Sequence, residues 1–397
     1  MEEIAPASED DVREAIQAAI GAQRPLEILG EGTRRGFGRP VEASAVLSTR
    51  RLAGVTLYEP AELVLSARAG TPLRDILDLL ERNGQELAFE PIDHARFYGE
   101  ASGGGTIGGV VAVNACGPRR IKAGAARDHL LGFRCVTGRG DVVKSGGRVM
   151  KNVTGYDLSK LVTGSHGTLA VLTEVTLKVL PKAETEQTVL FSAETESAGL
   201  AILREASGLP FDVSSFALLP SLRTGAPTAA LRVEGPGISV DCRRDDLIAY
   251  LDGPGAAIHV LDEAQSRALW RDLRDAEPVR TVAGQIWRIS VAPGDGGDIV
   301  ATLRESRAPI VSYLYDWAGG LVWIGLEPAP DAHAGAIRAA VDAVGGHATL
   351  MRAEAQVRAA VPVFHPQPAA LAALTKRVKQ SFDPLFLLNR GRMRADF

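Results

Sequence analysis

Apolar residues in the first part of the chain recur alternately with the period of a helix and with that of a strand. Val12, Ile16 and Ile20 lie at helical intervals after an Asp-rich start, whereas the stretch 169–180 alternates between its two faces. The pattern predicts helices over 10–22 and from Thr71-Pro72 to Asn83-Gly84, and strands over 26–29, 64–69, 142–144 and 169–180.

The composition of the sequence changes after Pro181. Glycine becomes less frequent, and all four tryptophans of the chain follow this point. Strands over 188–191 and 229–233 and helices over 198–206 and 264–274 predict a separate α+β domain, and a last helix is expected over 368–382. We therefore divide the chain into residues 1–182, 183–365 and 366–397, and find no convincing internal repeat in the sequence.

Composition narrows the class of protein. Hydrophobic residues make up 46% of the 397 residues and charged residues 23%, as in an ordinary soluble globular protein. The net charge of −4 argues against a nucleic-acid partner, which usually requires a basic face. The acidic start of the sequence does not resemble a signal peptide. No apolar run reaches the roughly 18 residues needed to span a membrane. The three scattered cysteines fit a reducing cytoplasm.

A glycine string at 103–109 contains a formal G-x-G-x-x-G, with Asp128 further along the chain, which suggests a Rossmann dinucleotide site. The context contradicts this assignment. A buried strand should come directly before the string, but 94–102 has no strand character. A long helix should follow, but 110–115 is cut off by Cys116-Gly117-Pro118.

Glycine loops at three separate places fit an anionic cofactor better. Backbone N–H groups can point at a phosphate only where no side chain blocks its approach. Loops of this kind occur at 30–33, at Gly108-Gly109 and at 164–168. Each alone would more often simply turn the chain, but three of them close together favour a pyrophosphate-binding site.

The glycine loops occur in sequence blocks that resemble a known family. These blocks are Leu29–Arg34, Thr106–Ala115, Lys151–Leu158 continued by Gly164–Leu169, and a tail with Phe382-Asp383-Pro384 and Asn389-Arg390-Gly391-Arg392. They resemble the FAD-binding proteins of the vanillyl-alcohol-oxidase and p-cresol-methylhydroxylase type. Gly117-Pro118-Arg119-Arg120 and the stretches 286–291 and 316–323 are similar, within that superfamily, to the family of short FAD-binding subunits of glycolate oxidases.

The resemblance implies an α+β fold: a two-subdomain FAD-binding domain of the p-cresol-methylhydroxylase type (1–182), a smaller α+β cap-like domain (183–365) and a C-terminal segment that returns to the flavin (366–397). It also implies a set of cofactor-binding residues. The expected residues are Gly30, Glu31, Gly32, Thr33, Thr106, Gly108, Gly109, Asn114, Gly117, Gly167, Thr168, Val171, Asn389 and Arg392.

The chain departs from the family's pattern at three places. His166 stands where many relatives have Glu, and Arg390 replaces the usual Pro after the tail Asn. The first glycine loop has no histidine that could bond covalently to flavin, so the resemblance implies non-covalent FAD.

Metal-assisted hydroxy-acid oxidation in this branch uses clustered histidines in the second domain. Here His259, His333 and His347 are isolated in the sequence, and His365 lies at the domain junction. We therefore expect no metal site and assign no catalytic residue. Arg119-Arg120 and Lys122 suggest an anion site or, with equal weight, a solvated basic loop.

Three functions are compatible with these features. The first is a cytoplasmic FAD-binding redox subunit of a glycolate (2-hydroxy acid) dehydrogenase, with a homologous catalytic FAD subunit and an iron–sulfur subunit as partners and membrane association only through them. The second is a self-sufficient FAD-dependent dehydrogenase of another small hydroxy acid. The third is an assembly subunit whose flavin is vestigial.

Overall fold

The computed structural model describes residues 1–100, 104–147, 155–220, 225–252 and 257–397. It divides into two compact units. Unit 1 comprises Met1–Cys116, Gly124–Lys182 and Pro366–Phe397, and unit 2 comprises Gly117–Ala123 and Ala183–His365. The chain thus passes from unit 1 to unit 2 after Lys182 and returns after His365, and the short segment 117–123 also belongs to unit 2.

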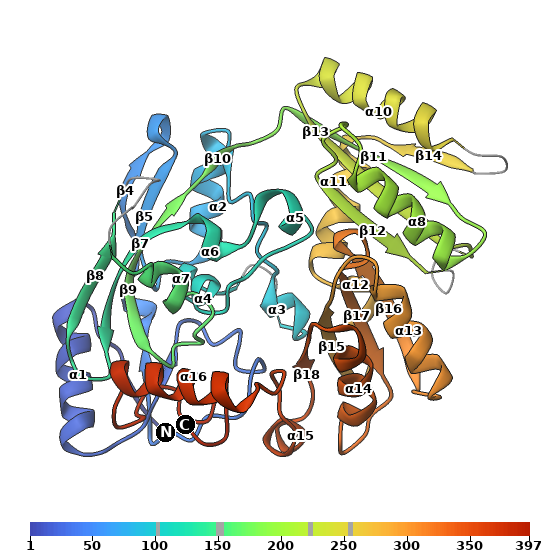
Figure 1. Cartoon of the computed structure of the whole chain (residues 1–397). Helices are drawn as coiled ribbons and strands as arrows, with labels where there is room; N and C mark the ends of the chain where they lie inside the picture. Colours follow the sequence, from blue (N-terminus) through green and yellow to red (C-terminus); the bar gives the residue numbers. More distant parts are fainter. Residues whose placement is uncertain (101–103, 148–154, 221–224, 253–256) are drawn as a thin grey trace. The chain divides into compact units, whose positions relative to one another are not determined.

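Unit 1 contains two main sheets (Figure 1). The smaller is parallel, in the order β1–β3–β2, with strands Glu2–Ile4, Ala45–Ser48 and Leu26–Leu29. The larger is antiparallel, in the order β4–β5–β9–β7–β8. Its strands are Val55–Glu59, Val64–Arg68, Ala170–Lys178, Leu130–Thr137 and Val142–Gly146, and a short pair is formed by β6 (Gln85–Glu86) and β10 (Leu180–Pro181).

The helices of unit 1 are mostly short. They are α1 (Glu9–Gly21), α2 (Leu73–Arg82), α3 (His94–Phe97), α4 (Ile107–Ala112), α6 (Ala126–His129), α7 (Leu158–Val162) and α16 (Ala369–Phe382). Helix α1 begins with a capping box, in which Ser8 accepts a hydrogen bond from the backbone N–H of Asp11 and the Asp11 side chain accepts one in return. Its buried residues Val12 and Ile16 join Leu26 and Leu47 in one apolar core.

The predicted elements of unit 1 are confirmed at nearly their expected positions. The region before α4 also agrees with the rejection of a Rossmann site, because α3 is helical rather than extended and α4 has only six residues. Two parts of the predicted motifs, Gly103 and residues 151–154, lie outside the described residues.

Unit 2 is built around one antiparallel sheet with the strand order β14–β11–β13–β12–β16–β17–β15–β18. The strands are β11 (Thr185–Ser192), β12 (Ser215–Leu219), β13 (Thr228–Gly235), β14 (Ile258–Leu261), β15 (Gln285–Ser290), β16 (Ile310–Asp316), β17 (Leu321–Leu326) and β18 (His347–Arg352). The helices are α5 (Arg120–Ala123), α8 (Glu196–Ser207), α10 (Gly237–Leu251), α11 (Glu263–Arg274), α12 (Glu277–Arg280), α13 (Gly296–Glu305), α14 (Ala334–Val344) and α15 (Ala355–Ala360).

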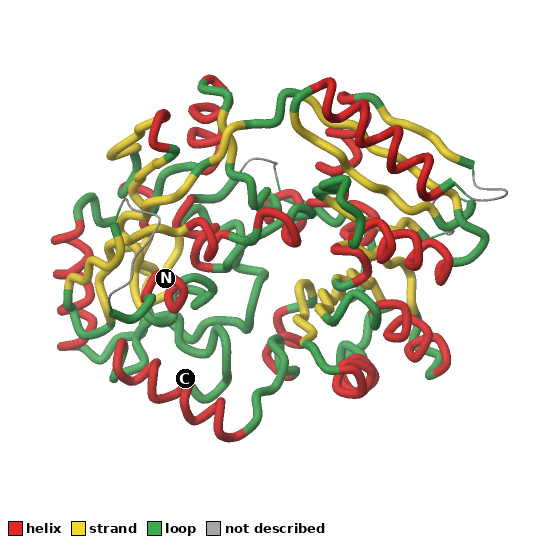
Figure 2. Tube along the Cα trace, turned by 45° about the horizontal axis from the view of Figure 1, so that its top comes forward, coloured by secondary structure: helices red, strands yellow, loops and turns green. Residues whose placement is uncertain are grey.

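The order of helices and strands in this unit, which Figure 2 distinguishes by colour, repeats once along the chain. The elements β11-α8-β12-β13-α10-β14 correspond to β15-α13-β16-β17-α14-β18, with α11 and α12 between them, and the two halves join through β12 and β16. The sequence has no convincing internal repeat, so this duplication is visible only in the topology. The physical reason is that apolar patterning and strand pairing preserve a topology without preserving residue identity.

Each face of the unit 2 sheet has its own packing. Helices α8, α10, α13 and α14 contribute Leu203, Leu247, Leu303 and Val341 to one large core against the sheet. Helix α11 packs Trp270 against Ala217 and Ala230 in a separate cluster. The expected strands and helices of this region are therefore confirmed.

The C-terminal segment of unit 1 is fixed by a buried ion pair. Lys379 on α16 is 2% exposed, and its ammonium donates to Asp383 Oδ2 at 2.6 Å, to Thr168 O at 2.6 Å and to Leu388 O at 3.0 Å. Asp383 in turn accepts from the backbone N–H groups of Leu387 and Leu388 at 3.0 and 2.8 Å. All three ammonium protons are used, so this lysine connects the tail to the loop that contains Thr168.

We expect Lys379→Met to lower the free energy of unfolding by about 3–5 kcal/mol, because it leaves the Asp383 carboxylate buried without its counter-ion. Urea unfolding followed by circular dichroism measures the effect. Lys376→Met is a matched control on the same helix, because Lys376 is largely solvated and lies 3.7 Å from Asp396; its cost should stay within about 0.5 kcal/mol. Equal stabilities for the two variants would contradict the role of the buried pair.

Candidate functional site

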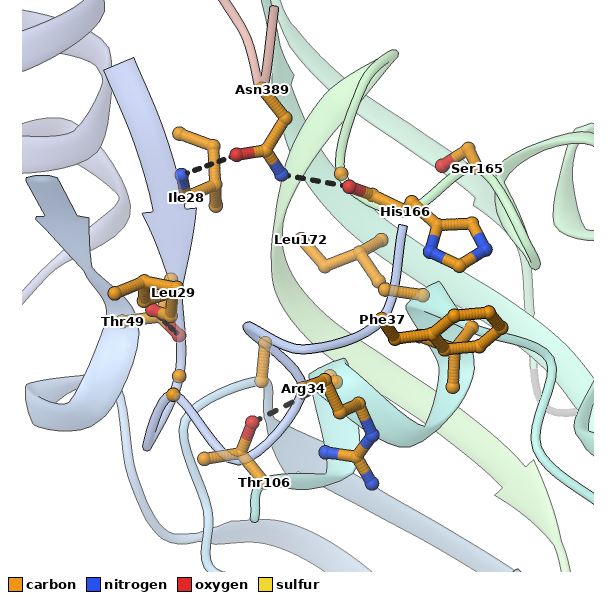
Figure 3. A pocket seen from close by; sticks show the side chains of 18 of the residues that line it. Ile28, Leu29, Arg34, Phe37, Thr49, Thr106, Ser165, His166, Leu172 and Asn389 are labelled. Atoms are coloured by element: carbon orange, nitrogen blue, oxygen red, sulfur yellow. Dashed lines mark hydrogen bonds between the residues drawn. The ribbon is translucent and has the colours of Figure 1, made fainter. Parts of the chain in front are cut away.

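The glycine loops line one cavity in unit 1. Its empty volume is about 830 Å³, with its open mouth included. The lining comes from the loop after β2, from α4, from the loop before β9 and from the C-terminal tail (Figure 3).

One of the lining glycines is required by close approach. A Cβ on Gly108 would lie 2.7 Å from the carbonyl oxygen of Ala69, whereas a Cβ on Gly109 would meet only the end of a flexible side chain, Arg34 Nη1, at 2.8 Å. Thr106 precedes them as the N-cap of α4, and its hydroxyl accepts from the N–H of Gly109 at 3.2 Å. The backbone at this wall of the cavity is therefore held in place.

The first glycine loop is attached to the same wall. The Glu31 carboxylate accepts a hydrogen bond from the N–H of Gly105. A Cβ on Gly30 would collide with the hydroxyl of Thr106. The loops at 30–33 and 105–109 thus lie in direct contact.

The tail residue Asn389 joins strand β2 to the loop before β9. Its Oδ1 accepts from the N–H of Ile28 at 2.8 Å, and its Nδ2 donates to the carbonyl of His166 at 2.7 Å (Figure 3). The residue has a φ of 45°, a left-handed conformation that asparagine tolerates better than most side chains. One amide side chain therefore fixes the distance between β2 and the loop before β9.

Arg392 fixes the loop after β2 from the other side. It is 5% exposed and donates from Nη1 to the carbonyls of Arg35 and Phe37, both at 3.1 Å. Its Nη2 lies 3.2 Å from Glu27 Oε1. Arg392 thus acts on the shape of the loop through backbone carbonyls.

An aromatic edge forms part of the cavity. The rings of Phe37 and His166 meet edge to face with centroids 4.7 Å apart. Burial, with added repulsion from the cations Arg392 and Arg34, lowers the pKa of His166 to about 3. The imidazole is therefore neutral at physiological pH.

Most of the residues predicted from the sequence line this cavity. They are Gly30, Glu31, Gly32, Thr33, Thr106, Gly108, Gly109, Gly167, Asn389 and Arg392. These residues come from four separate parts of the chain, and the fold brings them together.

The remaining predicted residues do not line the cavity. Asn114 uses its Oδ1 to accept from the N–H of Arg127, Thr168 donates to Ser165 O, and Val171 is fully buried in an apolar core. Gly117 belongs to unit 2, where its carbonyl accepts from Trp317 Nε1 at 3.2 Å.

The basic loop at 119–122 is partly solvated, and its charges pair with carboxylates of unit 2. Arg119 is 6% exposed and lies 3.1 Å from Glu234, while the exposed Lys122 pairs with Asp212. These carboxylates complement the basic residues and hold the loop within unit 2. The expectation of a solvated loop is therefore wrong for Arg119, and the anion site stays a prediction.

The histidines of the second unit lie on different elements. His259 is exposed on β14, His347 is on β18, and His333 bonds to Glu327 O. Within the described ranges, no three His, Cys, Asp or Glu side chains form a group that could hold a metal ion.

Some lining residues were not predicted from the sequence. Ile28, Phe37, Ser165 and Leu172 add apolar surface or backbone, and Arg34 adds a cation. Arg34 stands inside the first glycine block, so its position was visible, but a charged residue in a loop gives no sign that it is buried.

Comparisons with known proteins agree with this site. Residues 3–146 match the model of an FAD binding domain. The chain is 34% identical, over 96% of both sequences, to the glycolate oxidase subunit GlcE of Escherichia coli (strain K12). The chain belongs to the family of this FAD-binding subunit.

Two further relatives match slightly less than half of this chain. The glycolate oxidase subunit GlcD of Bacillus subtilis (strain 168) is 31% identical over 47% of this chain and 38% of its own. A D-lactate dehydrogenase of Archaeoglobus fulgidus is 32% identical over 47% of this chain and 40% of its own. An alkyldihydroxyacetonephosphate synthase structure, at 16% identity, covers 98% of this chain and 75% of its own with a TM-score of 0.69, which supports the fold.

The family gives the cofactor as FAD, and the protein is an FAD-dependent oxidoreductase with an FAD-binding domain of the p-cresol-methylhydroxylase type. The cavity fits this cofactor. The loop at 30–33 and Gly108-Gly109 line it, and the buried Nε of Arg34 has no hydrogen-bond partner among the described residues. Bound FAD supplies hydride and electron transfer, while the chain's own residues bind and orient it. The assignment of individual residues to FAD and its non-covalent binding stay predictions.

We expect Asn389→Ala to weaken FAD binding about tenfold and to cost about 1–3 kcal/mol of stability, because the N–H of Ile28 and the carbonyl of His166 lose their shared partner. Fluorescence titration of the apoprotein with FAD measures the affinity. Asn389→Asp keeps the acceptor and removes the donor, so its effect should be intermediate. The control is Asn83→Ala, at an exposed asparagine that donates to Leu79 O. If Asn389→Ala binds FAD with wild-type affinity, the hydrogen bonds of Asn389 do not support the FAD site.

The neutral His166 predicts acid sensitivity in the apoprotein. The unfolded chain takes up a proton near the ordinary pKa of 6.5, whereas the folded protein does so only near 3, so stability is lost as the pH falls below about 6.5. Between pH 7 and 5.5 we expect the wild type to lose about 1 kcal/mol more than His166→Gln. Urea unfolding at both pH values checks this, with His259→Gln on the exposed edge strand as the control. An identical pH dependence in wild type and His166→Gln would disprove it.

Proposed function

We propose that this chain is the FAD-binding redox subunit of a glycolate (2-hydroxy acid) oxidising complex. In this proposal it works with a homologous FAD-containing catalytic subunit and passes electrons toward an iron–sulfur subunit. The observation that carries the proposal is the full-length similarity to a protein named as a glycolate oxidase subunit. A similarity that spans both units is stronger support than one limited to the FAD-binding part.

The partners are proposed from the same relatives. A second glycolate oxidase subunit, GlcD, matches the chain over part of its length, as expected of homologous FAD subunits within one complex. Among the described residues, no helix has the length and apolar character needed to cross a membrane. We propose a cytoplasmic location, with any attachment to a membrane made through the partners.

A second candidate is a self-sufficient dehydrogenase of another small hydroxy acid. The relatives named as D-lactate dehydrogenase and D-2-hydroxyglutarate dehydrogenase favour it. They are 32% and 33% identical to this chain over less than half of its length, whereas the glycolate oxidase subunit matches over both units. The subunit proposal is therefore preferred.

Anaerobic mixing of the purified chain with glycolate, followed through flavin absorbance, separates these functions. We expect bleaching by the isolated chain to be slower by about tenfold or more than in the reconstituted complex, because the substrate-oxidising site belongs to the partner in this proposal. Fast bleaching of the isolated chain by glycolate or D-lactate would refute the relay function and support a self-sufficient enzyme. A chain that purifies without yellow cofactor, and does not take up added FAD, would indicate an assembly subunit.

A further inference from the structure

Arg34 is a partly buried cation that lines the cavity and forms no ion pair with the described residues. Its Nε has no accessible surface and no hydrogen-bond partner among the described residues, and its Nη1 has only a long contact of 3.5 Å to the Thr33 hydroxyl. No ion pair within 4 Å is formed to it in the described part of the chain. Figure 3 shows the side chain within the cavity, between Thr106 and Phe37.

The acidic groups that attract Arg34 electrostatically form no ion pair with it in the described part of the chain. Asp93 and Glu31 act on it only through longer-range attraction, and the Glu31 carboxylate is engaged by the N–H of Gly105. Burial lowers the pKa of Arg34 to about 10 in spite of them. The guanidinium therefore stays charged at neutral pH but is poorly solvated.

A buried charge without a partner destabilises the protein that contains it. The surrounding backbone also keeps this side chain in its position. The guanidinium lies against Gly105 and Gly109, where an added Cβ would be 2.9 and 2.8 Å from its Nη1. The cost and the tight packing are explained together if an anion enters the cavity beside it.

We propose that Arg34 binds the diphosphate of FAD and makes the cavity select the dinucleotide over flavins without phosphate. In oxidised FAD the diphosphate carries the negative charge, while the flavin and adenine rings are neutral. A guanidinium offers several N–H donors in a planar fork that matches two phosphate oxygens. The proposal rests on FAD binding and is independent of the hydroxy-acid substrate.

The test compares ligands with and without phosphate on the full-length apoprotein. FAD and riboflavin are titrated by fluorescence quenching, and ADP is titrated as a competitor of FAD. We expect Arg34→Met to raise the Kd for FAD at least about tenfold and to weaken ADP in the same proportion, since one charged contact of this kind is worth a factor of ten or more. The Kd for riboflavin should stay within about twofold of the wild-type value.

Thermal melting of the apoprotein separates binding from a structural role. Because Arg34→Met removes an unpaired buried charge, the Tm without ligand should be unchanged or higher, while the increase in Tm on adding FAD should shrink. Arg34→Lys retains the charge without the fork and should lie between the two; it also serves if the Met variant does not fold. Arg82→Met, at an exposed arginine on α2, changes the net charge equally and should behave as wild type.

Two results would overturn the proposal. The first is an FAD affinity of Arg34→Met within twofold of wild type. The second is a parallel loss of FAD and riboflavin with a lower Tm of the apoprotein, which would show that Arg34 only supports the fold. Failure of the wild-type protein itself to bind FAD would instead contradict the cofactor assignment, so the two failures can be distinguished.

Discussion

The cofactor cavity depends on the attachment of the C-terminal tail through the Asn389 amide. Strand β2 and the loop before β9 come from distant parts of the chain, and no strand pairing among the described residues joins them directly. Asn389 satisfies a backbone donor of one and a backbone acceptor of the other. Lys379 and Asp383 hold the tail in the register that this bridge requires. Because an amide accepts and donates at the same time, no apolar residue of similar size could replace it.

Around this bridge, the cavity has an uneven distribution of charge. The glycine-lined wall has a guanidinium, whereas the aromatic edge has a neutral imidazole and a phenyl ring. A diphosphate linked to flat neutral rings has the same division between charged and apolar parts.

Much of the fold could be predicted from local sequence patterns, but the burial of particular polar side chains could not. Apolar periodicity located α1, β2 and α2, and the glycine loops indicated most of the cavity, since both signals arise from neighbouring residues. Lys379 looked like a surface lysine of an amphipathic helix, and Arg119 looked like part of a basic loop. Their burial depends on Asp383 and Glu234, which no spacing rule connects to them. The duplicated topology of unit 2 was missed because it is preserved in strand order and not in sequence.

The insertion of unit 2 into unit 1 has a consequence for synthesis. Residues 1–182 leave the ribosome first, but the cavity that they form lacks Asn389 and Arg392 until all of unit 2 has been translated. Domains that consist of one continuous segment can fold while the chain is still growing. Unit 1 is complete only once residues 366–397 have been made, so we expect the cavity to be finished, and the cofactor to be loaded, after the translation of unit 2.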